Sequence, residues 1–381
     1  MARCSTSSLR LVYCQIEMKT QERNTTNNRN SDPYLSIVVA SRNDEHGGNT
    51  LRRTQVSFSG LLGQLEKYHI ESELILVEWN PPSDRPLLKD VLKWPDKLKY
   101  CTIRVIVVPP SIHRRYKYSD KTPMHVTVAV NSGIRRSRGQ FVLPGVIDLL
   151  YSDELMFWIA LKKLKSDERY RVNRCDVDRN VLQYDTLKEQ LDFCKQNIIQ
   201  INSHLHDGPR HGLPDLHTNA CGDFQLIYRD YWFLLHGYRE GDIAAAHVDG
   251  LFSYAAYVAG VKEVILNDPM RIYHIDHDDK YTERQKEIKP RFEKLLSLPF
   301  IPGPISGRIV SIYRKIVGNK TKTEVYRIPT LSSPDFLRLC RDIVTGKRSY
   351  VFNDEKWGLA GETLKEFTVR TADWEKKYEK N

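Results

Sequence analysis

Long apolar runs are missing from this 381-residue chain. No segment reaches the roughly eighteen consecutive apolar residues that a membrane-spanning helix needs, so we expect no such helix. Residues 1–20 also contain too short an apolar stretch for a secretory signal. These absences predict a cytoplasmic protein, and they leave open an association with the cytoplasmic face of a membrane.

Cysteine is sparse and unpatterned, with seven residues and no C-x-x-C pair. This excludes the usual zinc-finger spacing and a disulfide scaffold, and it favours a reducing compartment. Glycine-rich phosphate loops are missing as well. No G-x-G-x-x-G follows the first apolar run, and no G-x-x-x-x-G-K-S/T occurs, so a dinucleotide-binding Rossmann site and a P-loop are both disfavoured.

Positive charge is in excess, and the formal net charge is +10. Such a balance indicates an anionic partner, which could be nucleic acid, an anionic membrane surface or a phosphorylated small molecule. The basic residues are dispersed along the chain, and no nucleic-acid recognition motif is visible, so we do not expect nucleic acid to be the partner.

Strands and helices are predicted to alternate in the first part of the chain. Apolar, β-branched runs predict strands at 34–40, 73–79, 103–108 and 141–147, and helical spacing predicts helices at 50–69 and 126–138. This alternation predicts an α/β fold with a mainly parallel sheet flanked by helices. Pro144 lies within the fourth strand and indicates an irregular or edge position. Ligands of such sheets bind beyond the carboxyl ends of the strands.

Asp148 stands where the fourth predicted strand ends. A carboxylate at this position can bind a hard divalent cation, although a turn or a helix cap is the commoner role of such a residue. The helix that leads into this strand carries Asn131, Arg135 and Arg136. Arginine matches phosphate oxygens well, and the alternative is an ordinary solvated basic face.

Two further segments carry candidate chemistry. Asp249 lies in HVDGLFSYAAY, a helix (247–259) that is otherwise suited to burial. Its carboxylate is therefore expected to cap the helix, to form a structural ion pair, or to face a cleft as a general base. The tract RIYHIDHDD contains His274, whose imidazole could complete a metal site begun by Asp148, and His277. The tract could equally be a simple polar loop. Helices are also expected at 152–164 and 185–198.

The order of these elements resembles that of the GT-A glycosyltransferases, in particular the inverting family 2 type, over residues 34–280. In that family a segment after the first strand opens the nucleotide site, which corresponds here to Ser41, Arg42 and Asn43 in SIVVASRND. The second strand ends in an acid that contacts the nucleoside, and Glu78 has that place in ILVEWN.

The remaining family motifs follow in the same order. An Asn-x-Gly helix leads to the metal-binding D-x-D strand; here AVNSGIRRSRGQFVLPGVID retains only the last acid, Asp148. The acidic pair that supplies the catalytic base reads V-D, which places Asp249 in that role. A histidine after the last core strand completes the metal site in many members, and His274 matches it.

The resemblance implies a fold and an organisation. We expect a disordered leader at 1–33, a GT-A core at 34–280 with a nucleotide-sugar half (34–148) and an acceptor half (149–280), and a C-terminal extension of unknown role at 281–381. The implied donor-binding residues are Ser41, Arg42, Asn43, Glu78, Asn131, Arg135 and Arg136, and the acceptor residues are Asn219, Gly222 and Asp223 in TNACGDF.

The implied activity is an inverting transfer of sugar from a nucleotide-diphosphate sugar, most simply a UDP-sugar, to a glycan, glycolipid or glycoprotein. Asp249 would be the general base, with Asp223 and Asp242 as competitors, and Mn²⁺ or Mg²⁺ would be held by Asp148 and His274. A non-catalytic sugar- or nucleotide-binding protein of the same fold is the alternative, and a nucleic-acid-binding protein is a weaker one.

Overall fold

A computed structural model describes residues 32–204, 212–241, 243–277 and 328–369 of the chain. Nearly all of the predicted leader, residue Asp242 and much of the predicted C-terminal extension lie outside these described residues. Within them, no helix is both long enough and apolar enough to cross a membrane.

Four parallel strands form one half of the sheet, in the order β3-β2-β1-β4. They are β1 (Leu35–Ser41), β2 (Ser72–Trp79), β3 (Cys101–Val108) and β4 (Phe141–Gly145). Helix α2 (Thr50–Lys67) packs on the face that carries Ile37, and helix α5 (Val126–Arg135) packs on the opposite face, at Val38. Helices on both faces explain why these strands are apolar throughout.

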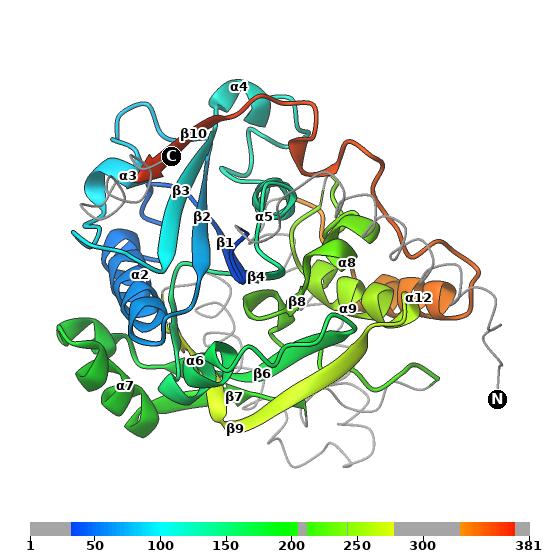
Figure 1. The fold of residues 1–381 in the computed structure, drawn as a ribbon. Coiled ribbons are helices and arrows are strands. Elements are labelled where there is room, and N and C mark those ends of the chain that lie inside the picture. The colour runs from blue at the N-terminus through cyan, green and yellow to red at the C-terminus, as the bar shows by residue number, and fades with distance from the viewer. Residues whose placement is uncertain (1–31, 205–211, 242, 278–327, 370–381) are drawn as a thin grey trace, which may run out of the picture.

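The other half of the sheet is mostly antiparallel and continues in the order β8-β6-β9-β5, with β7 paired to β6. These strands are β5 (Leu149–Tyr151), β6 (Glu168–Val177), β7 (Ile198–Asn202), β8 (Leu226–Tyr228) and β9 (Lys262–Ile275). Figure 1 shows the long strands β6 and β9 below the parallel half. The predicted α/β fold, with a central parallel sheet flanked by helices, is confirmed; the whole sheet is mixed, and the parallel strands form its first half.

Helices in the second half lie close to their predicted positions. They are α6 (Asp153–Ala160), α7 (Leu187–Gln196) and α9 (Val248–Val258). A further short helix, α8 (Arg229–Leu234), was not predicted. Helix α6 begins at the Ser152 cap, whose hydroxyl accepts the amide of Leu155. The shorter turns are α3 (Leu88–Val91), α4 (Pro110–His113) and the 3₁₀ segments η2 (Arg179–Gln183) and η4 (Cys221–Asp223).

Pro144 lies at an irregular position in β4, as expected for a residue that has no backbone N–H to donate to a neighbouring strand. Strand β4 is internal to the sheet, but its neighbour β8 pairs only with Phe141 and Val142. Pro144 lies beyond this pairing and is in register with Val38 of β1 on the other side. The strand therefore has a local edge at its carboxyl end, where the chain turns toward Asp148.

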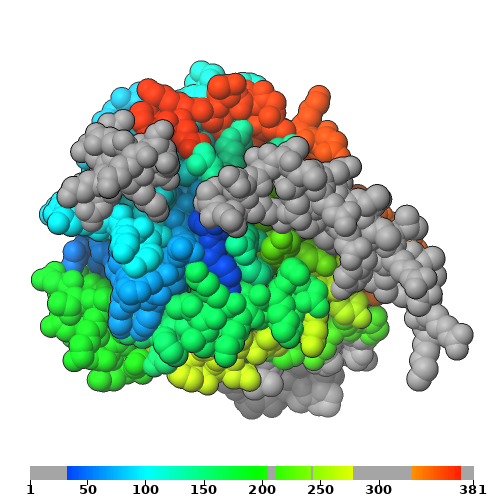
Figure 2. All heavy atoms as spheres, in the orientation of Figure 1, coloured from blue at the N-terminus to red at the C-terminus, as the bar shows by residue number. Residues whose placement is uncertain are grey.

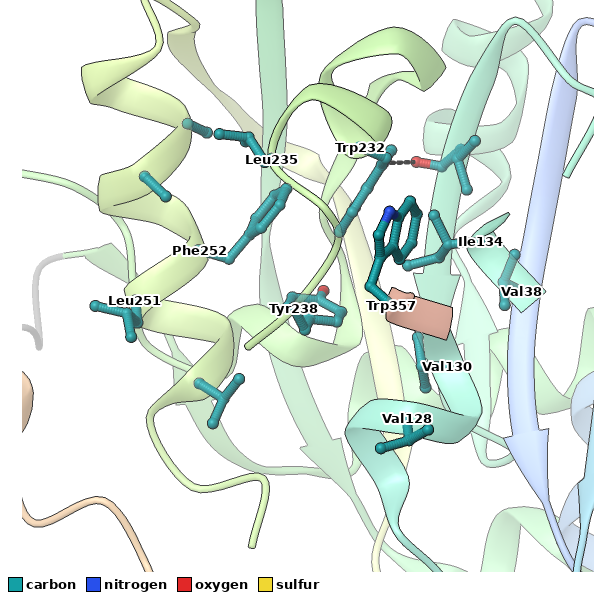
Figure 3. Close-up of a cluster of buried hydrophobic side chains, with 14 of the residues drawn as sticks. Val38, Val128, Val130, Ile134, Trp232, Leu235, Tyr238, Leu251, Phe252 and Trp357 are labelled. Atoms are coloured by element: carbon teal, nitrogen blue, oxygen red, sulfur yellow. Dashed lines mark hydrogen bonds between the residues drawn. The ribbon is translucent and has the colours of Figure 1, made fainter. Parts of the chain in front are cut away.

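The described part of the C-terminal region packs on the core. Helix α12 (Ser333–Val344) lies against α9, η5 (Trp357–Leu359) lies against α5, and β10 (Lys365–Val369) extends the sheet antiparallel to β3. Figure 2 shows this red segment along the upper rim of the molecule. Figure 3 shows Trp357 within the same apolar cluster as Trp232, Phe252 and Ile134. Residues 328–369 are therefore part of the main fold.

Gly139 is required where the chain enters β4. A Cβ atom added there would lie 2.5 Å from the backbone nitrogen of Ser36, so we expect Gly139→Ala to destabilise the protein by about 1–3 kcal/mol. The matched control is Gly63→Ala in α2, where nothing lies within 4 Å of an added Cβ. That change should stabilise the helix by up to about 1 kcal/mol. Urea unfolding measures both; similar effects in the two variants would contradict the close approach.

Candidate active site at the carboxyl edge of the sheet

Asp148 and two histidines form a cluster where β4 ends. Asp148 directly precedes β5, whose Leu149 is in register with His274 of β9. Its Oδ1 lies 3.7 Å from Nε2 of His274, and its Oδ2 lies 3.4 Å from Nε2 of His277. The carboxylate is only 4% exposed. Antiparallel pairing of β5 with β9 thus brings residues from distant parts of the sequence to one carboxylate.

The ring of His274 is held in one orientation by a second carboxylate, which contacts the ring nitrogen that does not face Asp148. Its Nδ1 lies 3.0 Å from Oδ1 of Asp176 on β6, which keeps the proton on Nδ1 and leaves Nε2 directed at Asp148. Burial by itself would lower the pKa of His274, but Asp148 and Asp176 raise it above its usual value. Burial lowers the pKa of His277, which favours its neutral, ligand-competent form.

The cluster fits a divalent metal ion. One oxygen of Asp148 and one nitrogen each of His274 and His277 lie within 4.8 Å of one another. A set with two imidazoles suits Mn²⁺ or another transition metal better than Mg²⁺, which prefers oxygen. The guanidinium of Arg53 also donates a hydrogen bond to Oδ2 of Asp148. Arg53 therefore already supplies positive charge at this carboxylate.

A cavity of about 280 Å³ opens at the same edge of the sheet. Its wall is formed by the end of β4, the start of α5, the η4 turn and the chain that enters α9. The lining residues include Val126, Thr127, Val130, Gly145, Gly222, Asp223, Tyr238, Val248 and Asp249. Two of the predicted site carboxylates, Asp223 and Asp249, thus face one space.

The two cavity carboxylates have different surroundings. Burial raises the pKa of Asp249, whose Oδ1 accepts the amide of Gly250 at 2.9 Å. Asp223 accepts a hydrogen bond of 2.7 Å from Nη1 of Arg174 and so forms an ion pair. Asp249 is therefore the cavity carboxylate whose pKa is shifted upward by burial, which is the direction that favours a general base.

A chain of charged contacts joins the cavity to the Asp148 cluster. Arg174 binds Asp223 on one side and Asp176, at 3.0 Å, on the other, and Asp176 holds His274. Sequence reasoning missed Arg53, Arg174 and Asp176. The segment RYRVNRCDV of β6 did carry a signal, since charged residues alternate with apolar ones over the length of a strand.

The predicted nucleotide segment follows β1 at the same carboxyl edge. Ser41 is buried and in register with Glu78 of β2. Asn43 donates through Nδ2 to the carbonyl of Pro86 at 2.7 Å, and Arg42 forms a 3.2 Å ion pair with Asp44. Ser41 and Glu78 therefore end neighbouring strands, as the sequence predicts.

Glu78 is fully buried, and its Oε2 accepts the amide of Leu88 at 2.9 Å. Burial raises the pKa of Glu78 to about 7, whereas an unfolded-state glutamate titrates at about 4.3. The folded state binds the proton more tightly, so this carboxyl makes stability fall as the pH rises from about 4 to about 7.

Glu78→Gln keeps an oxygen acceptor for Leu88 and removes the titration. Its stability relative to the wild type should therefore increase by about 3 kcal/mol between pH 4 and pH 8. Urea unfolding at both pH values measures the change, with the exposed Glu71→Gln as control. A difference that does not vary with pH would show that Glu78 titrates normally.

Arg135 and Arg136 lie at the opposite edge of the sheet from Asp148, which corrects their assignment to the donor diphosphate. Arg136 donates to the carbonyls of Gly358 and Leu359, and Arg135 donates to that of Trp357. Helix α5 runs antiparallel to the strands, so its carboxyl end lies beside their amino ends. Both guanidinium groups hold the C-terminal segment.

Asn131 is fully buried and also has a structural role. Its side chain accepts the amide of Tyr238 at 2.8 Å and donates to the carbonyl of the same residue at 2.7 Å. It therefore fixes a residue that lines the cavity, which differs from the predicted direct contact with the donor. Asn219 is not among the lining residues, and its carbonyl accepts a hydrogen bond from Arg171. Gly222 does line the cavity.

No protein-family model matches the sequence, and no curated protein matches it. Among solved structures, TarS 1–349 of S. aureus in complex with UDP is similar at 15% identity and a TM-score of 0.39, covering 74% of this chain and 71% of that one. A second structure of TarS 1–349 is similar at 14% identity and a TM-score of 0.40. That match covers 76% of this chain and 73% of the other.

A mannosyltransferase from Pyrobaculum calidifontis, PcManGT, in complex with GDP-Man and Mn²⁺, is similar at 12% identity and a TM-score of 0.34. The match covers 89% of this chain and 83% of that one. These identities and TM-scores are too low to establish a common fold or function.

Proposed function

We propose that this chain is a glycosyltransferase that uses a nucleotide-diphosphate sugar, with a UDP-sugar as the first donor to test and a carbohydrate-containing acceptor. The observation that carries the proposal is the pairing of two features at one sheet edge. A carboxylate with two imidazoles suits a cation beside a diphosphate, and a separate carboxylate with a raised pKa faces the adjoining cavity.

The proposed reaction is a single displacement with inversion. Asp249 takes the proton of an acceptor hydroxyl, whose oxygen attacks the anomeric carbon of the donor, and the nucleoside diphosphate leaves with the electron pair of the broken bond. Mn²⁺ or Mg²⁺, when bound at Asp148 and His274, supplies positive charge that stabilises the departing diphosphate. Ser41, Asn43 and Glu78 are proposed to line the nucleoside side, and Gly222 and Asp223 the acceptor side.

The test is a thermal-shift screen against UDP-, GDP- and TDP-sugars with and without Mn²⁺, followed by donor hydrolysis. A ligand raises stability by RT ln(1 + [L]/Kd), so a donor in tenfold excess over its Kd gives about 1.4 kcal/mol. We expect one nucleotide series to stabilise the protein and to be hydrolysed slowly. If no donor binds in any metal condition, the proposal is wrong.

A non-catalytic binding protein of the same fold is the second candidate, and one observation favours it. Arg53 already neutralises Asp148, the one acid of the D-x-D position that this sequence retains. Such a protein would be stabilised by a nucleotide or a sugar without any turnover of the donor. A complex with nucleic acid that is retained at moderate salt would instead support the weaker alternative, a nucleic-acid-binding protein.

A further inference from the structure

Arg53 is built into the Asp148 cluster by contacts on both sides. It lies in the first turn of α2 and is only 1% exposed. Its Nη1 donates to Oδ2 of Asp148, and its Nε donates to the carbonyl of Gly48 at 3.1 Å. Nη2 donates to the carbonyl of His46. All three nitrogens of the guanidinium are thus held, and the group cannot swing away without breaking several buried hydrogen bonds.

We propose that Arg53 is a built-in counter-cation of Asp148 and competes there with a divalent metal ion. Three groups that can carry positive charge approach this carboxylate within the described residues: Arg53 from α2, and His274 and His277 from the end of β9. Of these, Arg53 donates a direct hydrogen bond to the carboxylate, whereas the Nε2 atoms of His274 and His277 lie 3.7 and 3.4 Å from its oxygens. A divalent ion that binds the same carboxylate meets a buried guanidinium of like charge.

Burial makes this competition strong. A buried carboxylate without a partner is costly, so one cation has to be present, and two cations at one carboxylate repel each other in a weakly screened environment. The three potential metal ligands are correctly placed, but a metal ion must displace Arg53 or bind beside it. The wild-type protein should therefore bind Mn²⁺ weakly, and removal of the guanidinium should strengthen binding.

The experiment is a titration of Mn²⁺ into the full chain, followed by the electron paramagnetic resonance signal of the free ion, without any donor. Arg53→Met keeps an unbranched side chain similar to the apolar stem of arginine and removes the charged guanidinium. We expect it to bind Mn²⁺ at least about tenfold more tightly than the wild type, because Asp148 then lacks a counter-cation. The control is Arg52→Met, whose side chain is exposed and pairs with Asp185; its Mn²⁺ affinity should be unchanged.

Thermal unfolding gives an independent measure in the same samples. Mn²⁺ should raise the Tm of Arg53→Met more than that of the wild type, because stabilisation grows with the ratio of ligand concentration to Kd. A variant that folds only when Mn²⁺ is added would support the proposal in its strongest form. Equal or weaker Mn²⁺ binding in Arg53→Met would overturn it.

If Arg53→Met does not fold even with Mn²⁺, Arg53→Lys decides the matter. Its ammonium keeps the charge but cannot match the forked contacts to Asp148, His46 and Gly48. Lysine is thus a weaker competitor, and we expect several-fold tighter Mn²⁺ binding than in the wild type. No gain in this variant would also overturn the proposal. Since no donor is present, either outcome leaves the proposed sugar transfer to its own test.

Discussion

Asp249→Asn is expected to lower kcat by roughly 10²–10⁴-fold, the usual contribution of a general base. The substitution keeps the shape of the side chain and the oxygen that accepts the amide of Gly250. It removes the basicity that burial favours in this carboxyl. The donor Kd should remain near the wild-type value, because the Asp148 cluster is built from other residues. Steady-state transfer rates and donor binding by calorimetry measure the two quantities separately.

Asp223→Asn is the matched control for this experiment, since Asp223 lines the same cavity. Its carboxylate is already held by Arg174 in an ion pair of 2.7 Å, so it is less free to contact an acceptor hydroxyl, and the variant should lose much less of kcat than Asp249→Asn. If Asp249→Asn transfers sugar at the wild-type rate while Asp223→Asn does not, the roles are reversed. If Asp249→Asn does not fold, a structural role of Asp249 gains support, through contacts such as the hydrogen bond from the amide of Gly250.

Asp148→Asn is expected to weaken Mn²⁺ binding by at least roughly 100-fold and to remove any gain in donor affinity that Mn²⁺ provides. Asp148 is the only oxygen ligand of the cluster, and a neutral amide is a far weaker ligand for a hard cation. Calorimetric titration of Mn²⁺, and of UDP with and without Mn²⁺, measures both effects.

Asp96→Asn is the control for this variant, because Asp96 is exposed. Circular dichroism at the same temperature should accompany the titration, since the Asp148→Asn change leaves the buried Arg53 with only a neutral amide as its partner. An unchanged response to Mn²⁺ would remove Asp148 from the metal site.

Local patterns determined the parallel half of the sheet. The apolar runs of β1, β2, β3 and β4, and the helical spacing of α2 and α5, come from residues that are adjacent in the sequence. The position of Asp148 followed from the same pattern, since the carboxyl ends of parallel strands meet at one edge. Strand β10 was not predicted, because KEFTV is half-exposed and its partner β3 lies about 260 residues earlier, as the pairing of Arg104 with Glu366 shows.

The sequence by itself determined the α/β fold, the place of Asp148 at a strand end and the helix that carries Asp249. Only the tertiary structure decided which side chains meet. Arg53 reaches Asp148 across 95 residues, and His274 reaches Asp176 across 98. It also decided that Arg135 and Arg136 bind the C-terminal segment. The physical reason is that periodicity reports how one segment is buried, whereas the partner of a buried charge depends on strand order and register, which arise from packing between distant segments.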